Sequence, residues 1–140
     1  MGLFDRLRRP GLSPANTPPD WVERGEWREW PPPRDLVADP RTDEIARLAG
    51  PQGGVVPVAA GLIRDRFNPA DPDTIRVEVE GRLVGRLRRG AAAALAPALD
   101  RARCPIVTVC AVVRGGAAPA VYLWPERRLS DGPDIALPDD

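Results

Sequence analysis

Residues 68–87 decide the fold, and they read Asn68-Pro69-Ala70-Asp71-Pro72-Asp73-Thr74-Ile75-Arg76-Val77-Glu78-Val79-Glu80-Gly81-Arg82-Leu83-Val84-Gly85-Arg86-Leu87. Prolines with fixed φ stiffen the first part, where Asn and Asp side chains can accept bonds from nearby backbone amides. Apolar and charged residues then alternate, which predicts a strand. Glu80-Gly81 suits the positive φ angles of a tight turn, so residues 83–87 are predicted to return as a second strand. A rigid loop beside a hairpin is a candidate binding edge.

This stretch resembles the HIRAN domain, which is known from bacterial proteins and chromatin-remodelling helicases. The shared pattern is Asn-Pro-x-Asp-Pro-x-x-(apolar)-x-Val-x-Val-x-Gly-x-x-Val-Gly-x-Leu, followed by an Ala/Leu-rich helix that ends near Leu99. The resemblance covers roughly residues 55–125. It implies a small β-barrel that binds the 3′ end of single-stranded DNA.

The chain departs from the family pattern at four positions. Ala70 stands in place of Tyr, Asp73 in place of Asn, Thr74 in place of Ala, and Arg86 in place of the aromatic residue or His after the glycine. The strand alternation and the turn are unaffected, so the implied fold is unchanged. Without a ring at position 70, DNA affinity is expected to depend on charge rather than on stacking.

Composition predicts one small domain with tails. The chain has 140 residues, 43% of them hydrophobic, and a net charge of zero. Residues 55–128 contain twelve Arg and seven acidic residues, a local charge of +5, and every basic residue of the chain is Arg. We divide the chain into a proline- and Trp-rich arm (1–41), a HIRAN-like barrel (42–128) and an acidic tail (129–140).

Apolar patterning predicts five short strands and two helices. The strands are expected at residues 55–63, 75–79, 83–87, 106–113 and 120–124, with Pro57 near a strand start or at an edge. A helix is expected from Thr42, capped by Thr42 or Asp43 and ended by Gly50, and a second over 90–102, kinked or split at Pro97. The predicted class is mainly β with short helices, a small partly open OB-like or HIRAN-like β-barrel.

The arm is rich in proline, yet it carries Trp21, Trp27 and Trp30. Disordered linkers usually lack aromatic residues, so this segment is expected to pack on something. It either folds over the barrel of its own chain or forms a site for another protein.

The cysteines and the apolar stretches of the sequence indicate the cellular compartment of the protein. Cys104 and Cys110 would lie roughly 20 Å apart along one strand, too far for a disulfide, so we expect reduced thiols and a cytoplasmic protein. No apolar stretch is long enough to span a membrane, and residues 1–9 lack the apolar core of a signal peptide. Leu3, Phe4 and Leu7 fit either a frayed terminus or a short membrane anchor, and no stable membrane association is expected.

Residue types exclude most catalytic chemistry. The chain has no His and no Lys, so His-based catalysis, His-metal sites and a Lys-containing phosphate loop are all excluded. Ser13 and Ser130 lack a nucleophile motif, and local turn bonding accounts for Asp71 and Asp73. We therefore predict a non-enzymatic protein without a cofactor or metal ion.

The candidate nucleic-acid-binding residues surround the loop and the hairpin. Arginines at this edge would attract phosphates, although the same residues fit a solvated strand face that is balanced by Asp65, Glu78 and Glu80. Phe67 and Tyr122 are the nearby aromatic candidates, and each also fits a core position. The candidates are Arg64, Arg66, Asn68, Asp71, Arg86 and Arg88, with Arg89 beside them.

Two functions follow from these patterns. The first is a module that binds single-stranded DNA or DNA ends. The alternative is a protein-interaction or scaffold module that has lost the DNA pocket and docks through the Trp-rich arm or a barrel edge.

Overall fold

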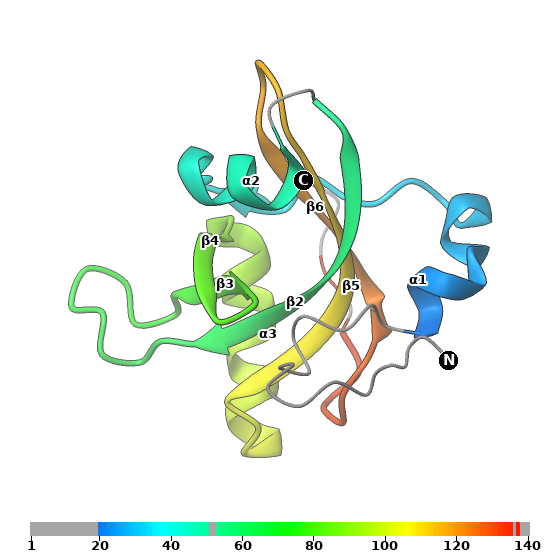
Figure 1. Cartoon of the computed structure of the whole chain (residues 1–140). Coiled ribbons are helices and arrows are strands. Elements are labelled where there is room, and N and C mark those ends of the chain that lie inside the picture. Colours follow the sequence, from blue (N-terminus) through cyan, green and yellow to red (C-terminus); the bar gives the residue numbers. More distant parts are fainter. Residues whose placement is uncertain (1–19, 51–52, 136, 138–140) are drawn as a thin grey trace, which may run out of the picture.

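The computed structural model describes residues 20–50, 53–135 and 137. They form a six-stranded antiparallel sheet in the order β1-β4-β3-β2-β5-β6, curved into a half-barrel and accompanied by short helices (Figure 1). The predicted fold class is confirmed. Leu3, Phe4 and Leu7 lie outside the described residues.

The predicted helices and strands occur in the predicted order, and the structure adds one short strand and two short helices near the start of the described chain. The strands are β1 (Val37–Ala38), β2 (Val55–Arg64), β3 (Ile75–Val79), β4 (Arg82–Leu87), β5 (Ile106–Arg114) and β6 (Ala120–Arg128). The helices are α1 (Asp20–Arg24), the 3-10 helix η2 (Glu26–Glu29), α2 (Thr42–Ala49) and α3 (Arg89–Ala102). No helix within the described ranges is long and apolar enough to cross a membrane.

The β3–β4 hairpin forms as the sequence predicts. Glu80 and Gly81 both have positive φ, 55° and 77°, as a two-residue turn of this kind requires. Ile75, Val77 and Val79 are buried, whereas Arg76 is exposed. The register shifts at Val77/Glu78, which marks a bulge that bends this end of the sheet.

Strand β5 is buried on both faces, which explains its continuous apolar sequence. Val107, Val109, Ala111 and Val113 belong to the main core, together with the apolar residues of α3. Cys110 and Val112 point to the other face and join a second core with Trp21 and Trp124. In Figure 1, α1 accordingly lies on the opposite side of β5 and β6 from α2 and α3.

A short segment of the predicted arm joins the two ends of the sheet. Arg34 exchanges two backbone hydrogen bonds with Leu123 of β6, at 2.7 and 2.9 Å. Three residues later, β1 pairs with β4, with Val37 opposite Leu87 and Ala38 opposite Arg86. Residues 34–38 therefore connect one edge of the half-barrel to the other.

Two helix details differ from expectation. Helix α2 begins at Thr42, but Arg41 occupies the N-cap position and no side chain caps the helix; Gly50 ends it with a φ of 80°, as predicted. The sequence predicts a kink or a split at Pro97; helix α3 runs unbroken through this residue, so the split is wrong. Pro97 and Ala93 are both exposed, and water can therefore satisfy the carbonyl that loses its helical partner.

The tryptophans of the arm pack on the barrel of their own chain. Trp21 stacks on Trp30 with ring centroids 5.6 Å apart, and Trp30 meets the edge of Trp124 at 5.1 Å. The indole N–H of Trp124 also donates to the Pro31 carbonyl at 2.7 Å. Of the two interpretations of the arm, the structure therefore supports folding over the barrel.

Replacement of Gly85 by Ala should destabilise the fold. A Cβ there would lie 2.5 Å from Val37 Cγ1 and 2.9 Å from the Ala38 carbonyl oxygen, so β1 would have to move. We expect a loss of about 1–3 kcal/mol in the free energy of unfolding, measured in urea. Gly61→Ala is the matched strand control, because its Cβ meets nothing closer than 3.8 Å. If the two variants are equally stable, Gly85 does not lie as close to β1 as the structure indicates.

The two thiols should react differently, because both are free but only Cys110 is buried. Burial raises the pKa of Cys110 to about 11, so almost no thiolate is present at pH 8. In a Cys104→Ser background, iodoacetamide should label Cys110 far more slowly than in denaturant, and Trp21→Ala should speed the reaction. Labelling of the folded protein at the denatured rate would show that the arm does not cover this face.

Candidate nucleic-acid interface

The loop at residues 65–74 connects β2 to β3 and is held by its own polar groups. Asn68 Oδ1 accepts a hydrogen bond from the Ala70 amide at 3.0 Å, and Asp71 Oδ1 accepts one from the Asp73 amide at 3.0 Å. The Thr74 hydroxyl donates to the Asp71 carbonyl at 2.7 Å. The predicted local turn bonding of Asn68 and Asp71 is therefore confirmed, and the loop is preorganised.

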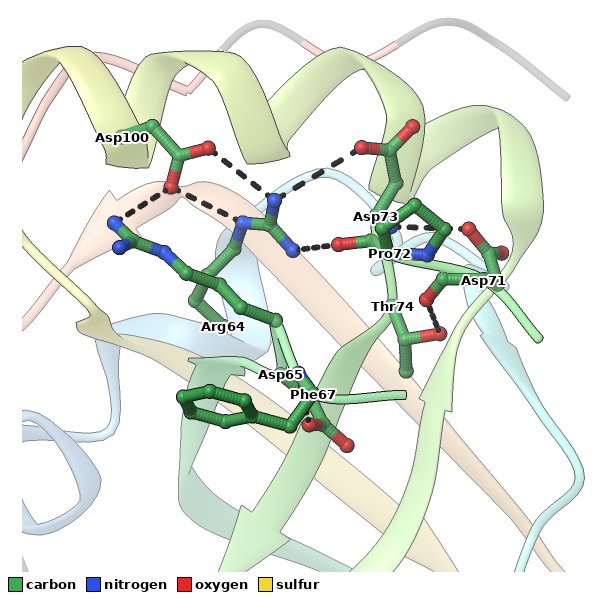
Figure 2. Close-up of polar contacts among 9 residues, drawn as sticks. Arg64, Asp65, Phe67, Asp71, Pro72, Asp73, Thr74 and Asp100 are labelled. Carbon is green, nitrogen blue, oxygen red and sulfur yellow. Dashed lines mark hydrogen bonds and ion pairs between the residues drawn. The ribbon is translucent and has the colours of Figure 1, made fainter. Parts of the chain in front are cut away.

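Arg64 anchors this loop to α3. Its side chain is only 7% exposed, and its Nε and Nη2 each lie 3.2 Å from a carboxylate oxygen of Asp100. Its Nη1 donates to the Pro72 carbonyl, and Asp73 lies 3.9 Å away (Figure 2). These contacts occupy the guanidinium group, so Arg64 positions the loop and does not face a ligand.

Asp100 is the shared partner of two arginines. It also accepts a bond from Arg66 Nη2 at 3.1 Å, although the Arg66 side chain stays 59% exposed. The hydrogen bond from Arg64 is the main cause that lowers the pKa of Asp100, and Arg66 adds to it against the effect of desolvation. Sequence reasoning missed Asp100, because 36 residues separate it from Arg64.

A second group of polar residues surrounds the start of α3. A small groove there is lined by Asp71, Thr74, Arg86 and Arg89, with Ala38, Leu87 and Ala92 as its apolar part. The Arg89 side chain is 88% exposed, and its Nε lies 4.0 Å from Asp71 Oδ2. No side chain caps the first turn of α3, so the positive end of the helix dipole faces this region.

Arg86, which lines this groove, and Arg88, the N-cap residue of α3, are each paired with a carboxylate from the chain around β1. Arg86 Nε lies 2.6 Å from Asp39 Oδ2, and Arg88 Nη2 lies 3.2 Å from Asp35 Oδ1. Both arginines remain about half exposed, at 50% and 46%. Asp35 belongs to the 34–38 segment that connects the two edges of the half-barrel, and Asp39 directly follows this segment.

The six predicted site residues thus divide into two groups. Asp71, Arg86 and Arg88 gather at the start of α3, where Arg89 joins them. Arg64 and Arg66 meet at Asp100 near its end, and Asn68 shapes the intervening loop. Within the described part of the chain, no group of His, Cys, Asp and Glu side chains could hold a metal ion.

The two aromatic candidates have opposite environments. Tyr122 is partly buried and packs on the Trp21–Trp124 core, where Arg114 lies over its ring at 5.2 Å. Phe67 is 94% exposed, so of its two interpretations the core position is wrong. The residues next to Phe67 in the sequence show no apolar periodicity, so the sequence could not predict whether this side chain is buried or exposed.

Comparison with known families agrees with this geometry. Residues 55–119 match the HIRAN domain, which covers β2 to β5 and the whole 65–74 loop. HIRAN domains are generally non-catalytic, DNA-binding modules. Neither the curated proteins nor the solved structures gave a match.

Acid should weaken the fold partly through Asp100. Its pKa is lowered in the folded state, so its contribution is complete above its unfolded pKa of about 3.9 and is lost as the pH falls through the folded value. Asp100→Asn should therefore have a lower melting temperature at pH 7 and a shallower further decline between pH 4 and pH 2. Asp131→Asn, at an exposed position, should keep the wild-type profile. Parallel profiles for wild type and Asp100→Asn would contradict this role.

Proposed function

We propose that this chain, whose residues 55–119 are a HIRAN domain, binds the 3′ end of single-stranded DNA in the groove at the start of α3. The observation that carries the proposal is the combination of Arg86, Arg89 and the uncapped α3 N-terminus around one fixed carboxylate, Asp71.

The cationic part of the groove suits a phosphate. Exposed guanidinium groups form charge-assisted hydrogen bonds to phosphate oxygens, and free backbone amides at a helix N-terminus add to the same field. Arg89 is the most available of these groups, because its side chain is 88% exposed and Asp71 is at the limit of ion-pair distance.

Asp71 favours a strand terminus over an internal phosphate. One of its carboxylate oxygens is committed to the Asp73 amide, whereas the other faces Arg89 at 4.0 Å. A carboxylate repels phosphate but accepts a hydrogen bond from a hydroxyl. An acid held among cations thus suits a ligand that presents both groups, as the terminal nucleotide of a 3′-hydroxyl strand does.

The protein-interaction alternative has less support in Trp21 than in the other two rings of the arm. Trp21 is buried against Trp30 and Trp124, so this ring already has partners within the chain. Trp27 and Trp30 are only partly buried and line a surface hollow with Pro32 and Pro33, so a docking site for another protein would have to use these two rings. Arg64 is withdrawn from the proposed contact residues, because it is buried by the loop that it anchors.

Removal of the groove arginines should weaken binding of a 5′-labelled, 3′-hydroxyl oligonucleotide measured by fluorescence anisotropy. For Arg89→Ala and Arg86→Ala we expect lower affinity and a smaller salt dependence, by about 0.7 in the logarithmic slope for each phosphate that the protein no longer neutralises. Arg82→Ala is the control, because this exposed arginine pairs with Glu44 next to the hairpin turn. If the wild-type protein binds the oligonucleotide and both groove variants bind it equally tightly, the groove is excluded as the binding site.

The terminus preference has its own test. Wild type should bind a 3′-hydroxyl oligonucleotide more tightly than the same strand with a 3′-phosphate. Asp71→Asn should reduce this preference, because the Asn side-chain oxygen can still accept the Asp73 amide while the repelling charge is gone. Equal affinity of wild type for both strands would exclude the proposed role of Asp71.

A further inference from the structure

We infer that Phe67, flanked by Arg66 and Arg103, is a stacking platform for a base of the strand whose end occupies the α3 groove. This inference rests on the proposed function and names a second contact for the same ligand.

The exposure of Phe67 is not explained by packing. Its side chain is 94% exposed, whereas the other exposed large hydrophobic residues in the described chain, Val55, Ile106 and Leu129, lie between 41% and 54%. Its backbone is nevertheless held in place, because the Phe67 amide donates to Asp65 Oδ1 at 3.3 Å. Figure 2 shows the ring apart from the Arg64–Asp100 ion pair.

The surroundings of the ring are cationic. Phe67 borders a surface hollow of about 620 Å³ that is also lined by Arg66, Arg103 and Asp100. Arg66 uses only Nη2 on Asp100, so its other donors are available. Arg103 is exposed and has no ion-pair partner among the residues described here. A free ring beside arginines is the combination by which proteins hold single strands: the ring stacks a base and the cations contact the backbone.

The platform and the groove lie within reach of one strand. The groove is at Arg89 and the platform is near Asp100, which are roughly 16 Å apart along α3, a length that a few nucleotides can cover. The 65–74 loop contacts both places, through Arg66 at Asp100 and through Asp71 at Arg89. Position 70 of this loop carries no ring, and Phe67 lies three residues before it.

The test compares two replacements of Phe67 by anisotropy with a 5′-labelled, 3′-hydroxyl oligonucleotide. Phe67→Leu keeps an apolar side chain but removes the π face, so the affinity should fall about 5- to 100-fold. Phe67→Trp should bind at least as tightly as wild type. Because the ring is exposed, both variants should melt at the wild-type temperature.

Abasic oligonucleotides show whether the ring acts by stacking. One base is removed at a time, counting from the 3′ end. The wild-type protein should bind more weakly than to the intact strand when the base at one internal position is missing. Phe67→Leu should bind this abasic strand as tightly as it binds the intact strand. If the affinity of Phe67→Leu relative to wild type is reduced by the same factor for every abasic strand, the stacking role is overturned.

Arg103→Asn tests the cationic flank. Arg103 has a φ of 53°, a conformation that Asn tolerates, so this replacement removes the charge with little backbone strain. The salt slope should fall by about 0.7 if Arg103 contacts one phosphate. An unchanged slope would exclude Arg103 from the platform.

Failures of the two proposals are distinguishable. If Phe67→Leu binds as wild type does while Arg89→Ala binds more weakly, the platform is wrong and the groove stands. If the wild-type protein binds neither a 3′-hydroxyl nor a 3′-phosphate strand at low salt, both are wrong.

Discussion

The contact between Arg64 and Asp100 fixes the relation between the 65–74 loop and α3, and both proposed DNA contacts depend on that relation. Arg64 holds two oxygens of Asp100 and the carbonyl of Pro72 with one planar group. Lysine has no such fork and could not hold the same three acceptors in one plane. Arg64 is 7% exposed whereas Asp100 is 39% exposed, and because burial of the arginine charge is costly, the pair is better understood as a contact that fixes geometry than as a large source of stability. It spans the loop, the last turn of α3 and the end of β2.

The segment that connects the two edges of the half-barrel also changes the charge of the proposed binding face. Residues 34–38 bond to β6 at one end and to β4 at the other. The same segment and the residue that follows it bring Asp35 and Asp39 onto Arg88 and Arg86. The packing of Trp21, Trp30 and Trp124 and the bond from Trp124 to Pro31 hold the chain just before it. The described part of the arm therefore influences the charge of the proposed binding face through these contacts.

The sequence predicts well what neighbouring residues determine. The hairpin and the loop were predictable because the Glu80-Gly81 turn, the alternation of β3 and the bonds of Asn68 and Asp71 are all local. Strand β1 was missed because it has two residues and exists only through its pairing with β4. The burial of Arg64 was missed because its partner Asp100 lies on a distant helix, and the exposure of Phe67 because no periodic pattern contains it.

The arrangement of partners, and not the number of arginines, sets the charge that a DNA strand would meet. Residues 55–128 have a formal charge of +5, yet Arg64, Arg66, Arg86 and Arg88 all contact carboxylates. The pairs of Arg86 and Arg88 are about half exposed, and such pairs contribute about 0–1 kcal/mol, so a phosphate can displace Asp39 or Asp35 at small cost. The buried fork of Arg64 cannot be exchanged in this way. Part of the ion-pair network is thus open to competition by DNA, while the part that shapes the loop stays in place.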